Sequence, residues 1–205
     1  MKIIKQGAEA KLYLDKDMVI KDRIRKGYRI KQIDEKIRRF RTSLEAKLIS
    51  EARRAGVPTP MVLDADKNEY KITMEFIDGK RIKEYFDGCK ESEVKRLSEQ
   101  IGRQIGILHS SGIIHGDLTT SNMILKEEKI YFIDFGLGFF SRRIEDQATD
   151  LKLMKEAIQS THFKILKQCW DNILKGYKKE YKDADKVIER VKEIEKRVRY
   201  AQKQE

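Results

Sequence analysis

The chain has 205 residues, of which 40% are hydrophobic and 39% are charged. The charged share is well above the roughly 25% of an average globular protein, yet apolar residues recur periodically along the whole chain, which argues against disorder. No stretch approaches the roughly 18 consecutive apolar residues of a membrane span, and Met1–Lys5 lacks the apolar run of a signal peptide. Cys89 and Cys169 are isolated and have no metal-ligand spacing, so we expect a cytoplasmic protein without a membrane segment.

The formal net charge of +11 favours an anionic partner such as nucleic acid or a phosphorylated ligand. Most of the excess lies in residues 23–41, where nine Lys and Arg stand against two acidic residues, a local net charge of +7 (nine minus two). Such a run is typical of a solvated helix face as well as of a binding surface. Both interpretations stay open at this point.

The first part of the chain has the pattern of a β-rich lobe. Lys11–Leu14 and Met18–Lys21 flank a polar turn and predict a β-hairpin. Thr42–Glu45 has the spacing of a capping box and predicts a helix that begins there and ends near Gly56. Tyr70–Phe76 alternates apolar and polar residues, which is the period of a half-buried strand. We assign residues 1–78 to this N-lobe.

Residues 79–205 have the pattern of a helical lobe. Apolar residues recur at helical spacing over residues 94–108. Two short apolar runs, Met123–Leu125 and Ile130–Ile133, then predict a buried hairpin. Beyond Asp146 the pattern is helical to the end of the chain. The sequence therefore predicts an α+β protein with a β-rich N-lobe and a helical C-lobe.

The stretch with the most chemical information is HGDLTTSN at residues 115–122, followed by DFG at residues 134–136. It places Asp117 in a loop, Asn122 at the far end of that loop, and Asp134 after the second hairpin strand. Mg²⁺ prefers carboxylate and amide oxygens together with phosphate oxygens, so we predict that Asn122 and Asp134 bind Mg²⁺ and that ATP completes its coordination. Asp117 then orients the nucleophile as the catalytic carboxylate. Both spacings match elements of protein kinases.

Two residues upstream fit the same arrangement. Lys21 ends an early strand and Glu45 lies in the predicted helix, and in kinases such a lysine meets the α- and β-phosphates and is held by a helix glutamate. Glu45 also has a purely structural interpretation, as part of the capping box. From topology alone, we expect backbone groups of Glu75 and Ile77 to meet the adenine. His115 is expected to hold the loop rather than to take part in chemistry.

A weaker signal precedes the hairpin at five residues: Gln6, Gly7, Ala8, Glu9 and Ala10. A loop covering the ATP phosphates is expected at this position, although it has one glycine where protein kinases usually have three. The small side chains still allow backbone N–H groups to approach phosphates. Glu9 either reaches toward the phosphates or is an exposed turn residue, and the sequence leaves both open.

Four segments together resemble the small atypical kinase/ATPase subunit of the KEOPS complex, also called the PRPK family: QGAEA (6–10), KGYR (26–29), HGDLTTSN (115–122) and IDFGL (133–137). The similarity spans nearly the whole chain. It implies a reduced two-lobed protein-kinase fold with ATP between the lobes, and a role in making the threonylcarbamoyladenosine modification of tRNA. The implied partners are the KEOPS carbamoyltransferase subunit, bound or fused, and other KEOPS subunits. Whether this chain is free or part of a fusion stays open.

Departures from ordinary protein kinases bear on the reaction. Gly116 stands where an arginine would pair with a phosphorylated activation loop, and little room follows Asp134, so we expect no extended activation segment. Thr119 stands where many kinases carry a lysine near the transferred phosphate, and its loss weakens charge stabilisation in the transition state. An atypical serine/threonine kinase and an ATPase both fit, but these departures favour ATP hydrolysis or self-phosphorylation over broad protein phosphorylation.

Three other interpretations compete. A small-molecule phosphotransferase of the aminoglycoside or choline type shares the His-Gly-Asp motif, but only 69 residues (205 minus 136) remain after Gly136 to enclose an acceptor. The RIO kinases are a closer alternative, although residues 119–121 and 6–10 fit the KEOPS subunit better. A tRNA-binding scaffold with little catalytic role is suggested by the basic segment. The retention of four residues argues against the scaffold: Lys21, Asp117, Asn122 and Asp134.

The positive charge is assigned to tRNA or to an acidic partner surface. The contacts are expected from five arginines: Arg38, Arg39, Arg41, Arg197 and Arg199. The apolar stripe of the last helix should pack on the C-lobe and leave its charges facing outward. Charge reversal of the first three arginines should spare ATP hydrolysis if their segment lies apart from the nucleotide cleft.

Overall fold

The computed structural model describes residues 1–7 and 9–201, the last four of them as backbone alone. Its N-terminal part is a five-stranded antiparallel sheet in the order β1-β2-β3-β5-β4. The strands are β1 (Lys2–Gln6), β2 (Ala10–Asp15), β3 (Met18–Arg23), β4 (Val62–Asp66) and β5 (Lys71–Glu75). The predicted hairpin and the alternating strand are confirmed as β2–β3 and β5.

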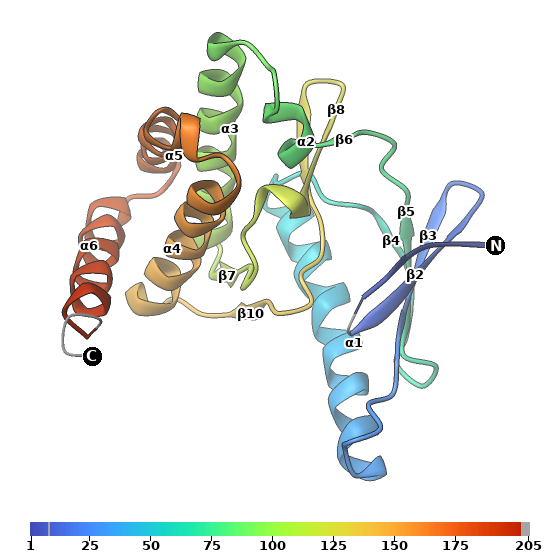
Figure 1. The fold of residues 1–205 in the computed structure, drawn as a ribbon. Coiled ribbons are helices and arrows are strands. Elements are labelled where there is room, and N and C mark those ends of the chain that lie inside the picture. The colour runs from blue at the N-terminus through green and yellow to red at the C-terminus, as the bar shows by residue number, and fades with distance from the viewer. Residues whose placement is uncertain (8, 202–205) are drawn as a thin grey trace.

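One long helix, α1 (Lys31–Arg54), lies between this sheet and the C-terminal helices, and its first turns extend beyond the rest of the molecule (Figure 1). The predicted start at Thr42 is wrong, because Thr42 lies inside α1 and its Oγ1 donates to the Arg38 carbonyl at 2.8 Å. Residues 31–41 contain no glycine or proline and are rich in Lys, Arg, Gln and Glu, which are strong helix formers. The helix therefore starts well before the capping-box spacing. After α1, Gly56 adopts a φ of +97°, a conformation that favours glycine.

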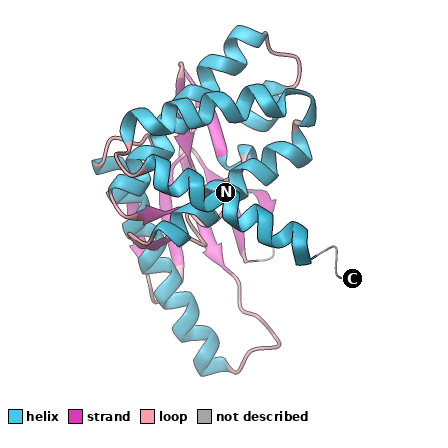
Figure 2. Cartoon of the chain, turned by 90° about the vertical axis from the view of Figure 1, so that its left-hand side faces the viewer, coloured by secondary structure: helices cyan, strands magenta, loops and turns pink. Residues whose placement is uncertain are grey.

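The C-terminal part combines short strands with five helices. β6 (Lys80–Arg81), β8 (Met123–Lys126) and β9 (Lys129–Phe132) form one small sheet, and β7 (Ile113–Ile114) pairs with β10 (Phe139–Phe140). The helices are α2 (Ile82–Phe86), α3 (Glu91–Ser110), α4 (Ile144–Thr161), α5 (Leu166–Glu180) and α6 (Ala184–Ala201), with 3₁₀ turns η1 (Thr120–Asn122) and η2 (Phe163–Ile165). Figure 2 shows the helices gathered in front of the strands. The predicted hairpin β8–β9 and the helical pattern after Asp146 are confirmed.

One apolar core continues through both parts of the molecule. Leu48 of α1, Ile72 of β5 and Phe132 of β9 belong to it and are fully buried. The architecture is α+β, as the sequence predicted, and the division into lobes at residues 78 and 79 remains our proposal. None of the helices in the described part of the chain combines the length and apolar character that a membrane span requires.

Helices α3 and α5 approach each other at backbone distance, because each contributes a glycine to the contact. A Cβ built at Gly102 would lie 2.0 Å from the Ile173 carbonyl oxygen, and one built at Gly176 would lie 2.0 Å from the Glu99 carbonyl oxygen. Real Cβ atoms do not approach backbone so closely. The two glycines therefore set the spacing of the helices on which the C-terminal part is built.

We predict that Gly176→Ala lowers the free energy of unfolding by about 2 kcal/mol. Because the new Cβ would lie 2.0 Å from backbone, we take the overpacking cost at the upper end of roughly 1–3 kcal/mol. Subtracting the roughly 1 kcal/mol that alanine gains over glycine within a helix leaves a net loss of about 2 kcal/mol. Urea unfolding of the purified chain measures the change. The control is Gly27→Ala, whose new Cβ would meet no described atom within 4 Å. Equal stability of the two variants would contradict the close helix contact.

Candidate active site

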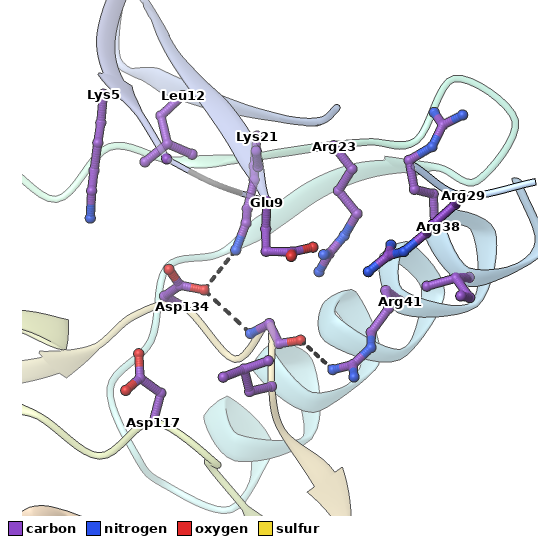
Figure 3. A pocket seen from close by; sticks show the side chains of 15 residues that line it. Lys5, Glu9, Leu12, Lys21, Arg23, Arg29, Arg38, Arg41, Asp117 and Asp134 are labelled. Atoms are coloured by element: carbon purple, nitrogen blue, oxygen red, sulfur yellow. Dashed lines mark hydrogen bonds and ion pairs between the residues drawn. The ribbon is translucent and has the colours of Figure 1, made fainter. Parts of the chain in front are cut away.

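A cleft lies between the N-terminal sheet and the C-terminal hairpin, and it has an apolar end and a charged end. Val19 and Met74 line the apolar end. Asp117 lines the charged end, where it points into the same cavity as Lys21 and Asp134 (Figure 3). Lys21 and Asp134 border both ends, so the two cavities form one continuous cleft.

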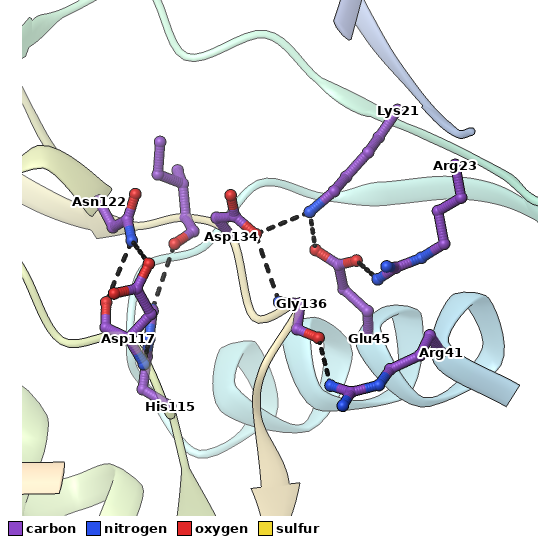
Figure 4. A network of polar contacts seen from close by, with 10 residues as sticks. Lys21, Arg23, Arg41, Glu45, His115, Asp117, Asn122, Asp134 and Gly136 are labelled. Atoms are coloured by element: carbon purple, nitrogen blue, oxygen red, sulfur yellow. Dashed lines mark hydrogen bonds and ion pairs between the residues drawn. The ribbon is translucent and has the colours of Figure 1, made fainter. Parts of the chain in front are cut away.

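A buried cluster of charges joins the sheet, α1 and the segment after β9 (Figure 4). Lys21 of β3 places its Nζ 2.6 Å from Glu45 Oε1 and 2.7 Å from Asp134 Oδ1. The other Glu45 oxygen accepts a hydrogen bond from the Arg23 guanidinium. Lys21 is 7% exposed and Glu45 is 1% exposed, so water screens these charges little. The Glu45 carboxylate therefore fixes two cations of β3 against α1.

These contacts decide which groups carry charge. Burial alone would lower the pKa of Lys21, but Glu45 and Asp134 outweigh it and the net pKa is raised. Burial alone would raise the pKa of Asp134, but the Lys21 ammonium outweighs it and the net pKa is lowered. At neutral pH the site therefore presents an ammonium group and a carboxylate, as a site for a phosphate and a cation requires.

Asp134 is held by its own backbone as well as by Lys21. Its φ is +64°, in the left-handed region that few residues other than glycine adopt. The Gly136 N–H donates to Asp134 Oδ1 at 3.3 Å, and the Gly136 carbonyl accepts from Arg41 Nη1 at 2.7 Å. The turn after β9 is thereby fastened to α1 through Arg41.

Asp117 and Asn122 belong to one loop and are hydrogen-bonded to each other. Asn122 Nδ2 donates to Asp117 Oδ2 at 2.8 Å and to the Asp117 carbonyl at 3.1 Å, which leaves the Asn122 amide oxygen for another ligand. Among the described residues, no group of three or more His, Cys, Asp or Glu side chains is arranged to hold a metal ion. A divalent cation bound by Asn122 and Asp134 would thus take its other ligands from the substrate or water, as Mg²⁺ commonly does.

A buried network that the sequence analysis missed supports this loop. Asp150 of α4 accepts the His115 N–H at 2.9 Å and the Gly116 N–H at 2.8 Å, and it contacts His109 Nε2 at 3.2 Å. A sequence signal existed, because Asp150 lies next to Leu151 on the buried stripe of α4. A carboxylate on such a stripe indicates buried donors that need an acceptor.

His115 holds the loop from the inside. The side chain is fully buried, and burial lowers its pKa, so the imidazole is neutral. Its Nδ1 accepts the Asp117 N–H at 3.3 Å, and its Nε2 donates to the Ile133 carbonyl at 3.2 Å. The imidazole therefore links Asp117 to the backbone just before Asp134.

The other residues expected to bind ATP lie around the same cleft. Gly7, Glu9 and Ala10 line the charged end, Gln6 ends β1, and Ala8 lies outside the described residues. The Glu9 carboxylate is 3.5 Å from Lys26 Nζ, so it forms an ion pair at the rim of the cleft.

Glu75 and Ile77 line the apolar end. The Glu75 N–H already donates to the Met61 carbonyl at 2.9 Å. Of the two backbone groups of Glu75, the carbonyl is therefore the one we expect to meet a ligand.

The basic residues of α1 divide between the cleft and the surface. Arg38 and Arg41 line the charged end of the cleft, so this segment is not separate from it. Charge reversal there is therefore expected to affect the cleft as well. Arg39 and Arg197 are exposed, and the Arg199 side chain lies outside the described residues.

Known proteins resemble this chain in sequence and in fold. The model of the RIO domain matches residues 1–139. The KEOPS complex subunit Bud32 of Pyrococcus abyssi is 45% identical, over 99% of this chain and 98% of that protein. A probable bifunctional tRNA threonylcarbamoyladenosine biosynthesis protein of Methanobrevibacter smithii is 46% identical over 97% of this chain, and one of Methanosarcina mazei is 45% identical. The chain spans 36% of each bifunctional protein.

Solved structures share the fold at low sequence identity. The Rio2 kinase of Chaetomium thermophilum, in its ADP/Mg²⁺-phosphoaspartate complex, matches with a TM-score of 0.64 and 16% identity, over 100% of this chain and 72% of that one. WaaP in complex with acyl carrier protein matches with a TM-score of 0.66 and 13% identity, over 96% of this chain and 88% of that one. Both likenesses establish a kinase-like architecture.

We predict that Asp150→Ala lowers the free energy of unfolding by about 3 kcal/mol. The substitution leaves two backbone N–H groups without an acceptor, one in the buried His115 and one in the partly buried Gly116, and an unsatisfied buried donor costs roughly 1–3 kcal/mol. Chemical unfolding measures the loss, and the exposed Asp171→Ala on α5 serves as the control. If both variants unfold at the same denaturant concentration, Asp150 does not support the loop in the way described.

Proposed function

The chain belongs to the RIO-domain family and to the relatives of the KEOPS subunit Bud32, and from this premise we propose that it is an ATP-dependent phosphotransferase that acts chiefly as an ATPase. One observation carries the proposal. Four polar side chains from three separate segments meet at one cleft: Lys21, Asp117, Asn122 and Asp134. Each has a distinct role in handling a nucleoside triphosphate.

In this proposal the adenine occupies the apolar end of the cleft, between Val19 and Met74, where it meets the Glu75 carbonyl and the Ile77 N–H. The triphosphate then runs toward Lys21, beneath the loop of residues 6–10. Lys21 is already oriented by Glu45, so binding requires only that its ammonium exchange Asp134 for phosphate oxygens. An ion pair that is formed before the ligand arrives reduces the cost of binding.

Asn122 and Asp134 would hold Mg²⁺. The residues fit this ion, because the Asn122 amide oxygen is not used by Asp117 and Asp134 has a second carboxylate oxygen besides the one that contacts Lys21. The ion would supply neutralisation of the phosphate charge. The Lys21 ammonium would share that task.

Asp117 is assigned as the catalytic carboxylate. In hydrolysis, a water oxygen forms a bond to the γ-phosphorus while the bond to the bridging oxygen breaks, and ADP leaves with the electron pair. Asp117 orients that water and accepts its proton. Asn122 Nδ2 donates to the Asp117 carboxylate, and the Asp117 N–H donates to His115 Nδ1, so both the side chain and the backbone of Asp117 are held before the substrate binds.

Hydrolysis or self-phosphorylation fits this chain better than phosphorylation of many proteins. Residues 135–143 are all that separate Asp134 from α4, and Phe139 and Phe140 of that stretch pair with β7. Little chain is left to form a platform for a peptide substrate. An atypical serine/threonine kinase activity would then be confined to a hydroxyl presented by this chain or by a bound partner.

The biological setting is proposed from the relatives' names. The Pyrococcus protein is a KEOPS subunit, and the bifunctional proteins act in tRNA threonylcarbamoyladenosine biosynthesis. We propose that this chain acts in the same process, beside the carbamoyltransferase subunit and other KEOPS subunits, and that it does so in the cytoplasm. The exposed Arg39 and Arg197 are the arginines we retain as contacts to tRNA or to an acidic partner surface.

The roles of the carboxylates are tested by two substitutions. Asp117→Asn should keep ATP affinity and lose turnover by about 100-fold or more, since positioning and deprotonating the nucleophile acts on the chemical step. Asp134→Ala should lose Mg²⁺-dependent ATP binding. Phosphate release and equilibrium ATP binding, measured with and without Mg²⁺, separate the two effects. Wild-type turnover by Asp117→Asn would remove Asp117 from the mechanism.

The role of Glu45 is tested on the same helix. Glu45→Gln removes the anion that Lys21 and Arg23 share, so we expect turnover to fall at least tenfold, with thermal unfolding recorded to show that the variant is folded. The control is Glu51→Gln, which changes a solvent-exposed pair with Arg54. Exposed pairs contribute little to stability or geometry. Turnover of Glu45→Gln within twofold of the control would show that the pair has no part in the reaction.

A further inference from the structure

Beyond Lys21, the charged end of the cleft continues into a space that the ATP assignment does not use. Four guanidinium groups line this space, which we call the arginine pocket: Arg23, Arg29, Arg38 and Arg41. Figure 3 shows these arginines on one side of the cavity, where they come from the end of β3, the following loop and α1. Four cations that border one cavity call for an explanation.

The guanidinium groups are fixed in place by buried partners. Arg38 Nε donates to Asp34 Oδ2 at 2.7 Å, and its guanidinium carbon lies 3.7 Å from the centre of the Tyr70 ring. Asp34 is fully buried, and Arg29 Nη1 is 3.9 Å from it. Arg23 is 5% exposed and bound to Glu45. Fixed donors lose little entropy when they bind a ligand, so the pocket is preorganised.

The donors exceed the acceptors available to them. Three of the four guanidinium groups, those of Arg23, Arg29 and Arg38, share two carboxylates, Asp34 and Glu45, and Glu45 also serves Lys21. Among the described residues, Arg41 donates to the neutral carbonyl of Gly136, and Arg23 Nε is buried without a hydrogen-bond partner. A buried unpaired donor is costly unless a ligand or water satisfies it. The pocket therefore has the charge and the free donors to take an anion.

The arginine pocket adjoins the reacting end of the cleft. The Gly136 peptide connects them, because its N–H contacts Asp134 and its carbonyl contacts Arg41. Asp117, the proposed catalytic carboxylate, lines the same cavity. An anion in the pocket would lie next to the position of the γ-phosphate.

We propose that the arginine pocket binds inorganic phosphate, the product cleaved from ATP, as a site distinct from the triphosphate site. The proposal rests on the proposed ATPase function for the source of the phosphate. Guanidinium groups match tetrahedral oxyanions because each can donate two parallel hydrogen bonds. The four guanidinium groups border one shared cavity, whereas a nucleic-acid backbone needs a row of outward cations. Of Arg38, Arg39 and Arg41, only Arg39 is exposed.

The test measures phosphate binding without turnover. Inorganic phosphate is titrated with the full chain in the presence of ADP and Mg²⁺, at constant ionic strength, and followed by ³¹P NMR. We expect saturable binding, and we expect Arg41→Gln to weaken it at least tenfold while the exposed Arg39→Gln leaves it unchanged. Arg41→Lys keeps the charge but not the paired donors, so it should also weaken binding. Thermal unfolding of each variant checks that it is folded.

Equal phosphate affinity of Arg41→Gln and Arg39→Gln, or no saturable binding by the wild-type chain, would overturn the proposal. Displacement of phosphate by an oligonucleotide without terminal phosphates, at comparable concentration, would also overturn it in favour of a nucleic-acid backbone. The ATPase proposal is tested separately: it fails if the chain releases no phosphate from ATP in the presence of Mg²⁺. Phosphate binding that depends on Arg41 supports the site whatever the turnover.

Discussion

The carboxylate of Glu45 is the point on which the cleft depends. It is buried and contacts both Lys21 and Arg23, so it ties β3 to α1, and through Lys21 it reaches Asp134. Removing one partner of such a buried pair typically costs about 3–5 kcal/mol, because the remaining charges lose their compensation. These contacts therefore fix the positions of the sheet, α1 and the segment after β9 relative to one another. That placement brings the phosphate-facing lysine and the metal-facing aspartate to the same point.

A second set of contacts positions the catalytic loop, and it meets the first at Ile133, just before Asp134. Asp150 holds the backbone at His115 and Gly116, and His115 in turn binds the Asp117 N–H and the Ile133 carbonyl. The loop is thus supported from α4, whereas Asp134 is supported from α1 through Lys21 and Gly136. The two carboxylates of the proposed reaction stand on different supports. A ligand that bridges them would couple the N-terminal sheet to the C-terminal helices.

Much of this arrangement was predictable from the sequence, because its signals are local. The hairpin β2–β3, the hairpin β8–β9 and the α+β class follow from periodicity. The prediction that Lys21 meets Glu45 came from the arrangement of protein kinases and the order of the elements. The predicted start of α1 was wrong, because the spacing of a capping box can also occur inside a helix when the residues before it favour helix formation. Asp150 and the inward turn of Arg38 and Arg41 were missed because they depend on contacts between residues distant in sequence, such as Arg41 with Gly136. Charge counting could locate the basic segment but not the side it faces.

The most direct measurement of this account is a crystal structure of the chain with a non-hydrolysable ATP analogue and Mg²⁺. The account predicts that Lys21 keeps its contact with Glu45 and moves from Asp134 to the α- and β-phosphates, while Asp134 and Asn122 coordinate the metal. The adenine should lie between Val19 and Met74. A nucleotide bound elsewhere, or Lys21 still paired with Asp134 while the analogue is present, would contradict the central role given to this cluster.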